Sequence, residues 1–233
     1  MQHKLMQVPL GLQLNKQATF ENYYIGEHAE VITALKNAAR GEGEAIIYLC
    51  GPRGQGLSHL LQAACYEASL HQRTSVYLPL RELIALPSDM LLGLESLSLV
   101  CIDDVQVLAE NKAWEEAVFH LFNRVRDSGG TLMITGQVLP KELPLTLPDL
   151  ISRLSWGVVY ALHPLTDNEK LTVLIMRARE RGITLSEEVG KYLLSHCPRH
   201  MRTLLAALDT LDRASLAAQR RLTIPFVKEV LQI

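Results

Sequence analysis

The sequence predicts an α/β protein in which a five-stranded parallel sheet is followed by a smaller unit made only of helices. Apolar runs of strand length alternate with segments of helical periodicity up to about residue 162. A glycine-rich loop separates the first of these runs from the helix after it. Beyond Pro164 the pattern is purely helical, with capping residues at several helix starts.

Composition and charge exclude several classes of protein. A chain of 233 residues that is 48% hydrophobic can bury the core of one large domain, or of a main domain and a small one. A net charge of −2 gives no field that attracts DNA, so we expect no direct sequence-specific DNA binding. No apolar run approaches the ~20 residues of a membrane span, and no signal peptide is recognisable. These features, with four scattered cysteines, predict a cytoplasmic protein without membrane contact.

The chain opens with a tail and an aromatic segment. Residues 7–12 (QVPLGL) combine helix-breaking Pro and Gly with alternating aliphatic residues, which fits either a frayed terminus or a docking peptide. Residues 19–26 (TFENYYIG) precede a helix expected over 27–39. Tyr24 and Ile25 in this segment are expected either to contact a nucleotide base or to seal an edge of the core.

The loop after the first strand has the pattern of a phosphate-binding loop. Residues 45–50 are an apolar run typical of a strand buried on both faces, and helical spacing resumes after residue 58. Gly51, Gly56 and Ser58 fit the pattern GxxxxGK[ST], but Leu57 replaces its lysine. Such loops direct backbone N–H groups at phosphate oxygens, although an ordinary glycine-rich turn also fits. Without the lysine, we expect nucleotide binding with poor stabilisation of charge transfer. The expected contacts are Gly51, Gly54, Gln55, Gly56, Leu57, Ser58 and His59.

Two carboxylates follow the third predicted strand. Residues 74–79 and 97–102 are expected to be the second and third strands, and Asp103 and Asp104 come directly afterwards. Carboxylates at this edge of a parallel sheet, beside a phosphate-binding loop, are placed to hold Mg²⁺ and to orient a water molecule. A turn or a helix cap is the alternative. The loop upstream favours the metal, with the Ser58 hydroxyl facing it.

The remaining elements complete the sheet and add the helical unit. We expect a helix over 114–128, a fourth strand over 131–135 that carries Gln137 to the same edge, a short helix over 147–154 and a fifth strand over 156–162. Four helices follow, the first opened by a capping box of Thr166 and Glu169. The predicted domains are a tail (1–18), an α/β domain (19–164) and a helical lid domain (165–233).

These pieces, in this order, resemble the AAA+ ATPase family and within it the branch of the replication initiator DnaA. The matching segments are 51–58 (Walker A), 100–104 (Walker B), 135–137 (first sensor), 150–157 (arginine finger) and 200–203 (second sensor). The resemblance covers about residues 19–233 and implies a P-loop sheet with a lid.

The resemblance also assigns roles to two arginines. Arg153 matches the arginine finger and would act in trans on ATP bound to the initiator. Arg202 matches the second sensor and would contact the phosphates of the chain's own nucleotide. From the residues alone, Arg153 is interpreted as a cation near a helix C-terminus and Arg202 as a surface arginine.

Two departures from the initiator pattern shape the expected function. The sequence is expected to lack the DNA-binding helix-turn-helix domain of that branch. Leu57 replaces the Walker A lysine, and Gln137 stands where the branch usually has an acid. The expected ligand is therefore a nucleoside diphosphate, ADP, with Mg²⁺, and autonomous ATP turnover is in doubt.

A chain of this kind is similar to regulatory members of the family that inactivate the initiator. In those proteins an N-terminal peptide docks on the β sliding clamp of DNA polymerase III, and Gln7, Leu10 and Leu12 match its anchors. The resemblance implies DnaA and the clamp as partners and leaves a homo-oligomer open. It implies a protein that stimulates hydrolysis of initiator-bound ATP and so prevents re-initiation of replication. The alternatives are an autonomous AAA+ ATPase, such as a helicase or clamp loader, and a DNA-binding initiator variant.

Overall fold

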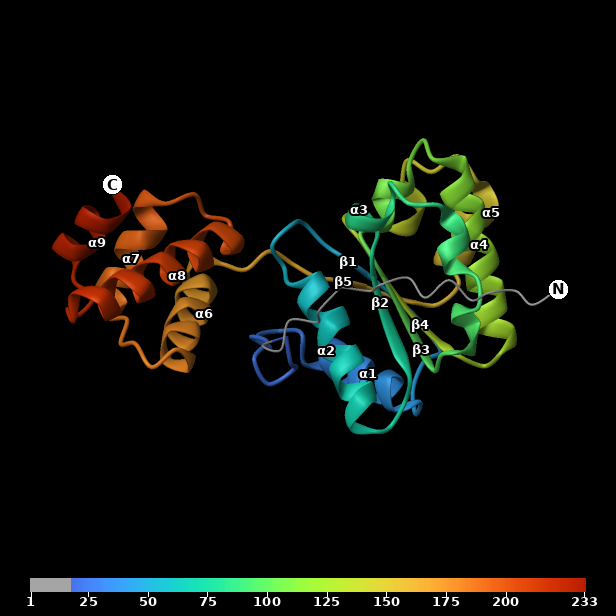
Figure 1. Ribbon diagram of the computed structural model, residues 1–233, viewed down its shortest axis with the longest axis horizontal. Coiled ribbons are helices and arrows are strands. Elements are labelled where there is room, and N and C mark those ends of the chain that lie inside the picture. The colour runs from blue at the N-terminus through green and yellow to red at the C-terminus, as the bar shows by residue number, and fades with distance from the viewer. Residues whose placement is uncertain (1–17) are drawn as a thin grey trace. The chain divides into compact units, whose positions relative to one another are not determined.

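The structure, a computed structural model, describes residues 18–233. The described chain forms two compact units, and it passes from the first to the second between Leu162 and His163 (Figure 1). The predicted docking residues Gln7, Leu10 and Leu12 lie outside the described residues. No helix of the described chain combines the length and the apolar character that a membrane span requires.

The first unit is a parallel sheet with helices on both faces. Its strands are β1 (Ile46–Cys50), β2 (Ser75–Pro79), β3 (Leu99–Asp103), β4 (Thr131–Gly136) and β5 (Val158–Ala161). Its helices are α1 (Ala29–Arg40), α2 (Leu57–Leu70), α3 (Leu80–Leu83), α4 (Lys112–Asp127) and α5 (Pro148–Leu154). These positions confirm the predicted five-stranded sheet and its alternation with helices.

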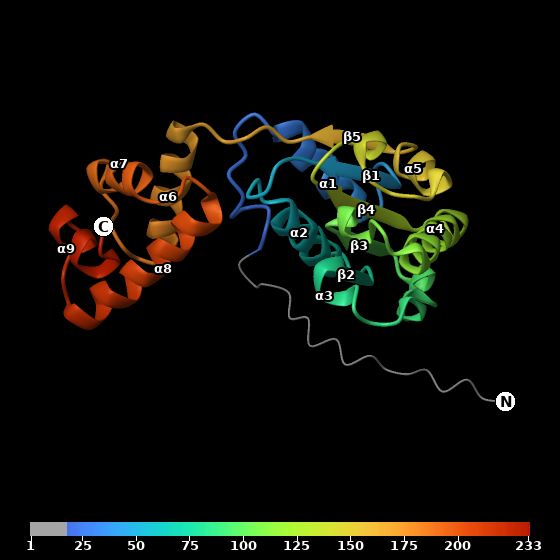
Figure 2. The ribbon, with the colours of Figure 1, turned by 90° about the horizontal axis from the view of Figure 1, so that it is seen from above.

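The strand order is β2-β3-β4-β1-β5, and every neighbouring pair is parallel. Helices α1 and α2 cover one face of this sheet, and α4 and α5 cover the other (Figure 2). Because all strands run the same way, their carboxyl ends lie at one edge. The loops that follow β1, β2, β3 and β4 therefore gather at that edge.

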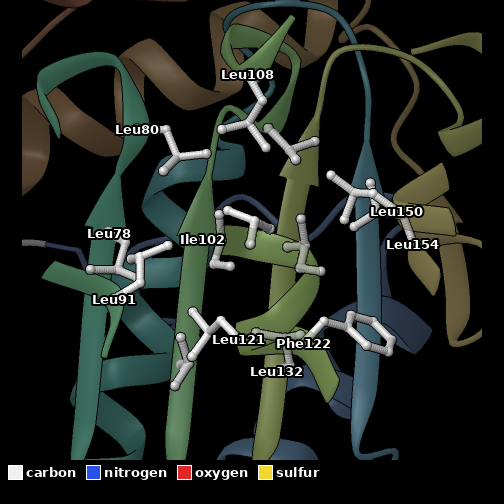
Figure 3. Close-up of a cluster of buried hydrophobic side chains, with 14 of the residues drawn as sticks. Leu78, Leu80, Leu91, Ile102, Leu108, Leu121, Phe122, Leu132, Leu150 and Leu154 are labelled. Atoms are coloured by element: carbon white, nitrogen blue, oxygen red, sulfur yellow. The ribbon is translucent and has the colours of Figure 1, made fainter. Parts of the chain in front are cut away.

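Alternate side chains of each central strand enter two separate cores. On β1, Ile47 and Leu49 pack with α1 and α2, whereas Tyr48 packs on the side of α4 and α5. Figure 3 shows the second of these cores, where Leu121 and Phe122 of α4 lie against the strands. Burial on both faces is why the strands read as continuous apolar runs rather than as alternating patterns.

The connection between β2 and β3 contains short elements for which the sequence analysis made no prediction. These are α3 and two 3₁₀ turns, Ser88–Leu91 and Leu94–Ser96. Each element is three or four residues long, too short for a hydrophobic period to be recognised. Strand β3 also extends to Asp103, which pairs with Pro79 of β2. Asp104 is therefore the first residue beyond the strand.

The second unit consists of four helices: α6 (Asp167–Glu180), α7 (Glu187–His196), α8 (Met201–Ala218) and α9 (Ile224–Leu231). The predicted capping box is confirmed, because the Thr166 hydroxyl accepts from the Glu169 N–H and the Glu169 carboxylate accepts from the Thr166 N–H. The side chains of Ser186 and Thr223 cap α7 and α9. The four helices bury apolar side chains of their own, among them Leu174, Leu204, Leu208 and Phe226.

Candidate functional site

The loop between β1 and α2 requires glycine at several positions. Gly54 and Gly56 have φ angles of +91° and +82°, in the left-handed region that favours glycine. Gly56 is also the N-cap of α2, and a Cβ there would lie 2.8 Å from a ring carbon of Tyr23. The loop thus leads directly into the N-terminus of a 14-residue helix. Unpaired N–H groups and the positive end of the helix dipole at such a terminus suit a phosphate group.

Tyr23 is the aromatic residue that supports this loop. Its hydroxyl donates to the carbonyl oxygen of Gln55 at 3.0 Å, and its ring centroid lies 5.8 Å from that of His59. Burial raises the pKa of Tyr23 to about 12, so the hydroxyl remains a donor at neutral pH. The sequence pointed instead to Tyr24, which is half-buried, and Ile25, which is exposed. The aromatic segment indicated that a ring lies near the loop, but it did not indicate which ring.

Leu57, at the position of the missing lysine, is the first residue of α2. Its side chain is half-buried and packs against the core beneath α1 and α2. The position therefore supplies no cation to the loop. Ser58 and His59 follow in the first turn of α2, and the His59 Nε2 lies 2.8 Å from the Thr19 carbonyl oxygen.

Asp103 is buried at the end of β3, and both of its carboxylate oxygens have hydroxyl donors. Thr135 donates to Oδ1, and Tyr77 donates to Oδ2 at 2.6 Å. Burial first, and then the negative charge of Asp103, raise the pKa of Tyr77 far above its ordinary value. The Tyr77 hydroxyl therefore keeps its proton and remains bonded to the carboxylate.

Asp104 has a φ of +63° and carries its side chain to Arg81, in the first turn of α3. The Arg81 Nε donates to Oδ2 at 2.5 Å, and the Gln106 Nε2 donates to Oδ1 at 2.5 Å. The backbone N–H of Asp104 donates to the Thr135 hydroxyl at 3.0 Å. The second carboxylate is thus neutralised by an arginine that the sequence analysis did not single out.

This arrangement does not fit a Mg²⁺ ion held by Asp103 and Asp104. The two oxygens of Asp103 accept from hydroxyls, and those of Asp104 accept from Arg81 and Gln106. A guanidinium in contact with Asp104 would repel a divalent cation at the same carboxylate. Over residues 18–233, no group of three or more His, Cys, Asp or Glu side chains could hold a metal ion.

Gln137, just beyond β4, joins the two arginines of this edge. With its amide oxygen facing the donors, it accepts from the Arg53 Nε at 3.1 Å and from an Nη of Arg81 at 3.0 Å. Its backbone N–H donates to the amide oxygen of Gln106 at 3.2 Å. Arg53 comes from the glycine loop and Arg81 from the end of β2, so Gln137 lies between them.

Arg153, the predicted finger, lies in the last turn of α5 beside an exposed tryptophan. Its guanidinium carbon is 4.9 Å from the ring centroid of Trp156, which is 59% exposed. Arg126 lies 5.2 Å from the same ring and is paired with Asp127. No carboxylate of the described residues pairs with Arg153, which is half-buried. Its charge is therefore available to a partner.

A buried glutamate fixes the start of helix α5. The side chain of Glu115, on α4, is fully buried and accepts from the backbone N–H groups of Thr146 and Leu147. The Thr146 hydroxyl donates to the same carboxylate at 3.1 Å. Leu147 is the N-cap of α5, so Glu115 anchors the segment through which the chain enters the helix of Arg153. No sequence pattern pointed to this role of Glu115.

The structure thus gathers part of the predicted site at one sheet edge. The loop residues, Asp103, Asp104 and Gln137 follow strands β1, β3 and β4, whereas Arg153 lies on α5. Arg202 is exposed in the first turn of α8 and belongs to the second unit. The residues that sequence reasoning missed are Tyr23, Arg53, Tyr77, Arg81, Glu115 and Trp156.

Two family models match separate parts of the chain. Residues 90–161 match the model of the bacterial DnaA ATPase domain, and residues 167–231 match the model of the lid domain of Hda. The first match contains Asp103, Asp104 and Arg153, and the second contains Arg202.

Solved structures of replication initiators share the fold. Domain III of the Thermotoga maritima replication initiation protein DnaA superposes with a TM-score of 0.81 at 22% identity, covering 94% of this chain and 98% of that one. DnaA from Aquifex aeolicus bound to AMPPCP gives a TM-score of 0.70 at 25% identity, covering 84% of this chain and 65% of that one. The Thermotoga maritima RuvB branch migration motor gives 0.67 at 16% identity, covering 94% and 73%. The chain therefore has the DnaA-like AAA+ fold, and its C-terminal unit matches the lid domain of Hda.

Proposed function

We propose that this chain is a cytoplasmic regulator that inactivates the DnaA initiator by stimulating hydrolysis of the ATP that DnaA holds. Arg153 enters the nucleotide site of a bound DnaA and neutralises charge that develops on the γ-phosphate. Residues 7–12 dock the regulator on the β sliding clamp. The outcome is DnaA bound to ADP and no further round of initiation.

The observation that supports this proposal is the state of Arg153. An arginine finger must keep its guanidinium unpaired and accessible until the partner arrives. Within residues 18–233, Arg153 pairs with no carboxylate, and its guanidinium carbon lies 4.9 Å from the centroid of the neutral Trp156 ring. The match of residues 167–231 to the Hda lid domain agrees with a regulator rather than with an initiator.

The chain's own nucleotide serves structure rather than turnover in this proposal. The glycine loop and the N-terminus of α2 bind the phosphates of a nucleoside diphosphate, ADP. Leu57 removes the cation that favours a third phosphate. Mg²⁺ is not part of the proposal, because the carboxylates predicted to hold it are engaged by other donors.

The test is phosphate release from ATP-loaded DnaA in the presence of clamp loaded on DNA. Addition of this protein is expected to accelerate hydrolysis by about 10³-fold or more, as for arginine fingers supplied in trans, with no ATP turnover by the protein alone. Turnover by the isolated protein without stimulation of DnaA would contradict the proposal and favour an autonomous ATPase.

Removal of residues 1–12 is expected to weaken stimulation at limiting protein concentration, by about tenfold or more, and to leave it nearly unchanged at saturation. The reason is that docking on the clamp raises the local concentration of Arg153 near DnaA without altering the chemistry. Titration of both forms into the same assay measures this shift. Equal potency of the two forms would exclude clamp docking through the tail.

Replacement of Trp156 with alanine is expected to reduce stimulation about two- to fivefold, which corresponds to the ~0.5–1 kcal/mol of an exposed cation–π contact. Trp156 is a positioning residue, so Trp156→Phe should recover much of the loss. Because the side chain is 59% exposed, thermal stability should hardly change. Leu92→Ala, which removes another exposed apolar side chain at 66% exposure, is the matched control. A Trp156→Ala variant as active as wild type would show that the stacking is not used.

Replacement of Leu57 with lysine is expected to shift nucleotide preference toward ATP over ADP by about tenfold, or ~1.4 kcal/mol. The new ammonium group would stand at the start of α2, where a P-loop lysine reaches the outer phosphates. Calorimetric titration with ATP and with ADP measures the ratio of dissociation constants, and Leu57→Met is the control that keeps the apolar packing. An unchanged ratio would contradict the assignment of the loop as a phosphate site.

A further inference from the structure

The strongest concentration of charged side chains around the loop lies at the edge where β2, β3 and β4 end. Arg53 arrives from the glycine loop, and Arg81 arrives from the first turn of α3, directly after β2. Both guanidinium groups donate to the amide oxygen of Gln137, over distances of 3.1 Å and 3.0 Å. Two cations from separate elements therefore converge on one neutral acceptor.

Of these two arginines, Arg53 leaves its positive charge uncompensated. Among residues 18–233, the carboxylate that pairs with Arg81 is that of Asp104, which also accepts from the Gln106 amide. Arg53 is exposed, and the described residues give it no carboxylate partner. Gln137 and Gln106 are neutral, so they orient the guanidinium groups without cancelling their charge.

The oxygens of both carboxylates at the same edge already accept hydrogen bonds from neighbouring side chains. Asp103 accepts from Tyr77 and Thr135, and the raised pKa of Tyr77 keeps its hydroxyl protonated. Asp104 is held by the Arg81 guanidinium at 2.5 Å. The Arg81 guanidinium thus provides the positive charge beside Asp104 that a bound metal ion would otherwise provide.

The position of the pair relative to the loop suggests its ligand. Arg53 is itself a loop residue, three positions before Gly56 at the N-cap of α2. A guanidinium presents a planar fork of N–H donors that matches phosphate oxygens. Leu57 occupies the position of the lysine that usually contacts the phosphate oxygens, and its side chain packs against the core.

We propose that Arg53 and Arg81 supply the positive charge for the phosphates of the bound nucleotide, and that nucleotide binding is therefore independent of Mg²⁺. This inference rests on the nucleotide site of the proposed function and states which side chains balance the negative charge of the phosphates there. The ligand class is a nucleoside diphosphate or triphosphate without its metal ion. Arg81 also neutralises the charge of Asp104. Replacement of Arg81 should therefore make nucleotide binding dependent on Mg²⁺.

The experiment is titration of the full chain with a fluorescent ADP analogue, in buffer with excess MgCl₂ and in buffer with excess EDTA. The wild type is expected to bind with dissociation constants that agree within about twofold. Arg81→Gln is expected to bind about tenfold more weakly in EDTA and to regain part of that loss in Mg²⁺, because Asp104 is freed. Arg53→Gln is expected to lose a similar factor in both buffers.

The controls separate binding from folding. Thermal unfolding without nucleotide checks that each variant is folded. If Arg81→Gln is unstable, Arg53→Gln still tests the inference, because Arg53 is exposed and its replacement should not affect folding. Lys141→Gln removes an exposed cation elsewhere in the first unit and should change nothing.

Three results would overturn the inference. Wild-type binding that weakens tenfold or more in EDTA, or arginine variants that bind as tightly as the wild type, would contradict it while leaving nucleotide binding intact. Absence of binding in both buffers would overturn the nucleotide site itself and the inference with it.

Discussion

Replacement of Arg153 with alanine is expected to abolish stimulation of DnaA-bound ATP hydrolysis, a loss of about 10³-fold or more in the accelerated rate, as for arginine fingers supplied in trans. The guanidinium would neutralise charge that exists only in the transition state, so its removal raises the barrier without weakening docking. Phosphate release from ATP-loaded DnaA with loaded clamp measures the effect.

Matched variants separate charge from geometry in that experiment. Arg153→Lys keeps the positive charge but loses the planar fork, and it should recover only a small part of the activity. Lys141→Ala removes an exposed cation from the same unit and should behave as wild type. Because Arg153 is half-buried without an ion pair among the described residues, its variants should retain the thermal stability of the wild type. Stimulation that survives in Arg153→Ala would refute the in-trans mechanism.

Replacement of Glu115 with alanine is expected to lower the free energy of unfolding by about 3 kcal/mol, since hydrogen bonds to a charged group contribute roughly 1.5–3 kcal/mol each and the change removes several. The Thr146 and Leu147 N–H groups would lose their acceptor at the entrance to α5. For a chain of this size the melting temperature should fall by roughly 6–12 °C. Thermal and urea unfolding measure the loss.

The neighbouring residue provides the control for Glu115. Glu116 lies next to it on α4, but its side chain is 51% exposed and pairs with Lys112 at 3.7 Å. Glu116→Ala should therefore change stability by less than about 0.5 kcal/mol. Equal destabilisation by the two substitutions would mean that the helix, rather than the buried anchor, accounts for the effect.

The elements of the fold could be read from the sequence because local patterns specify them. The strand over residues 46–50, the glycine loop after it and the capping box at Thr166 each depend on residues close together in the chain. Fully buried strands appear as apolar runs, and caps appear as particular residues at fixed offsets. Elements of three or four residues, such as α3, carried too little pattern to be recognised.

The candidate site could be predicted only in part. The loop glycines, the two carboxylates and Gln137 follow from strand ends that the pattern locates. Tyr23 was missed in favour of Tyr24 because an aromatic run in a turn has no period that fixes which ring faces inward. The metal role expected for Asp103 and Asp104 is not supported by the donors that surround them.

By itself, the sequence determined the α/β class, the parallel sheet, the glycine loop without its lysine and the four-helix unit. Only the tertiary structure brought Arg81 to Asp104, Arg53 to Gln137 and Glu115 to the start of α5. These partners are separated by 23 to 84 positions, and the strand order β2-β3-β4-β1-β5 determines which of them meet. Hydrophobic periodicity records which side of an element is buried, but not which other element lies against it. For that physical reason the charge balance of the site became visible only in the folded chain.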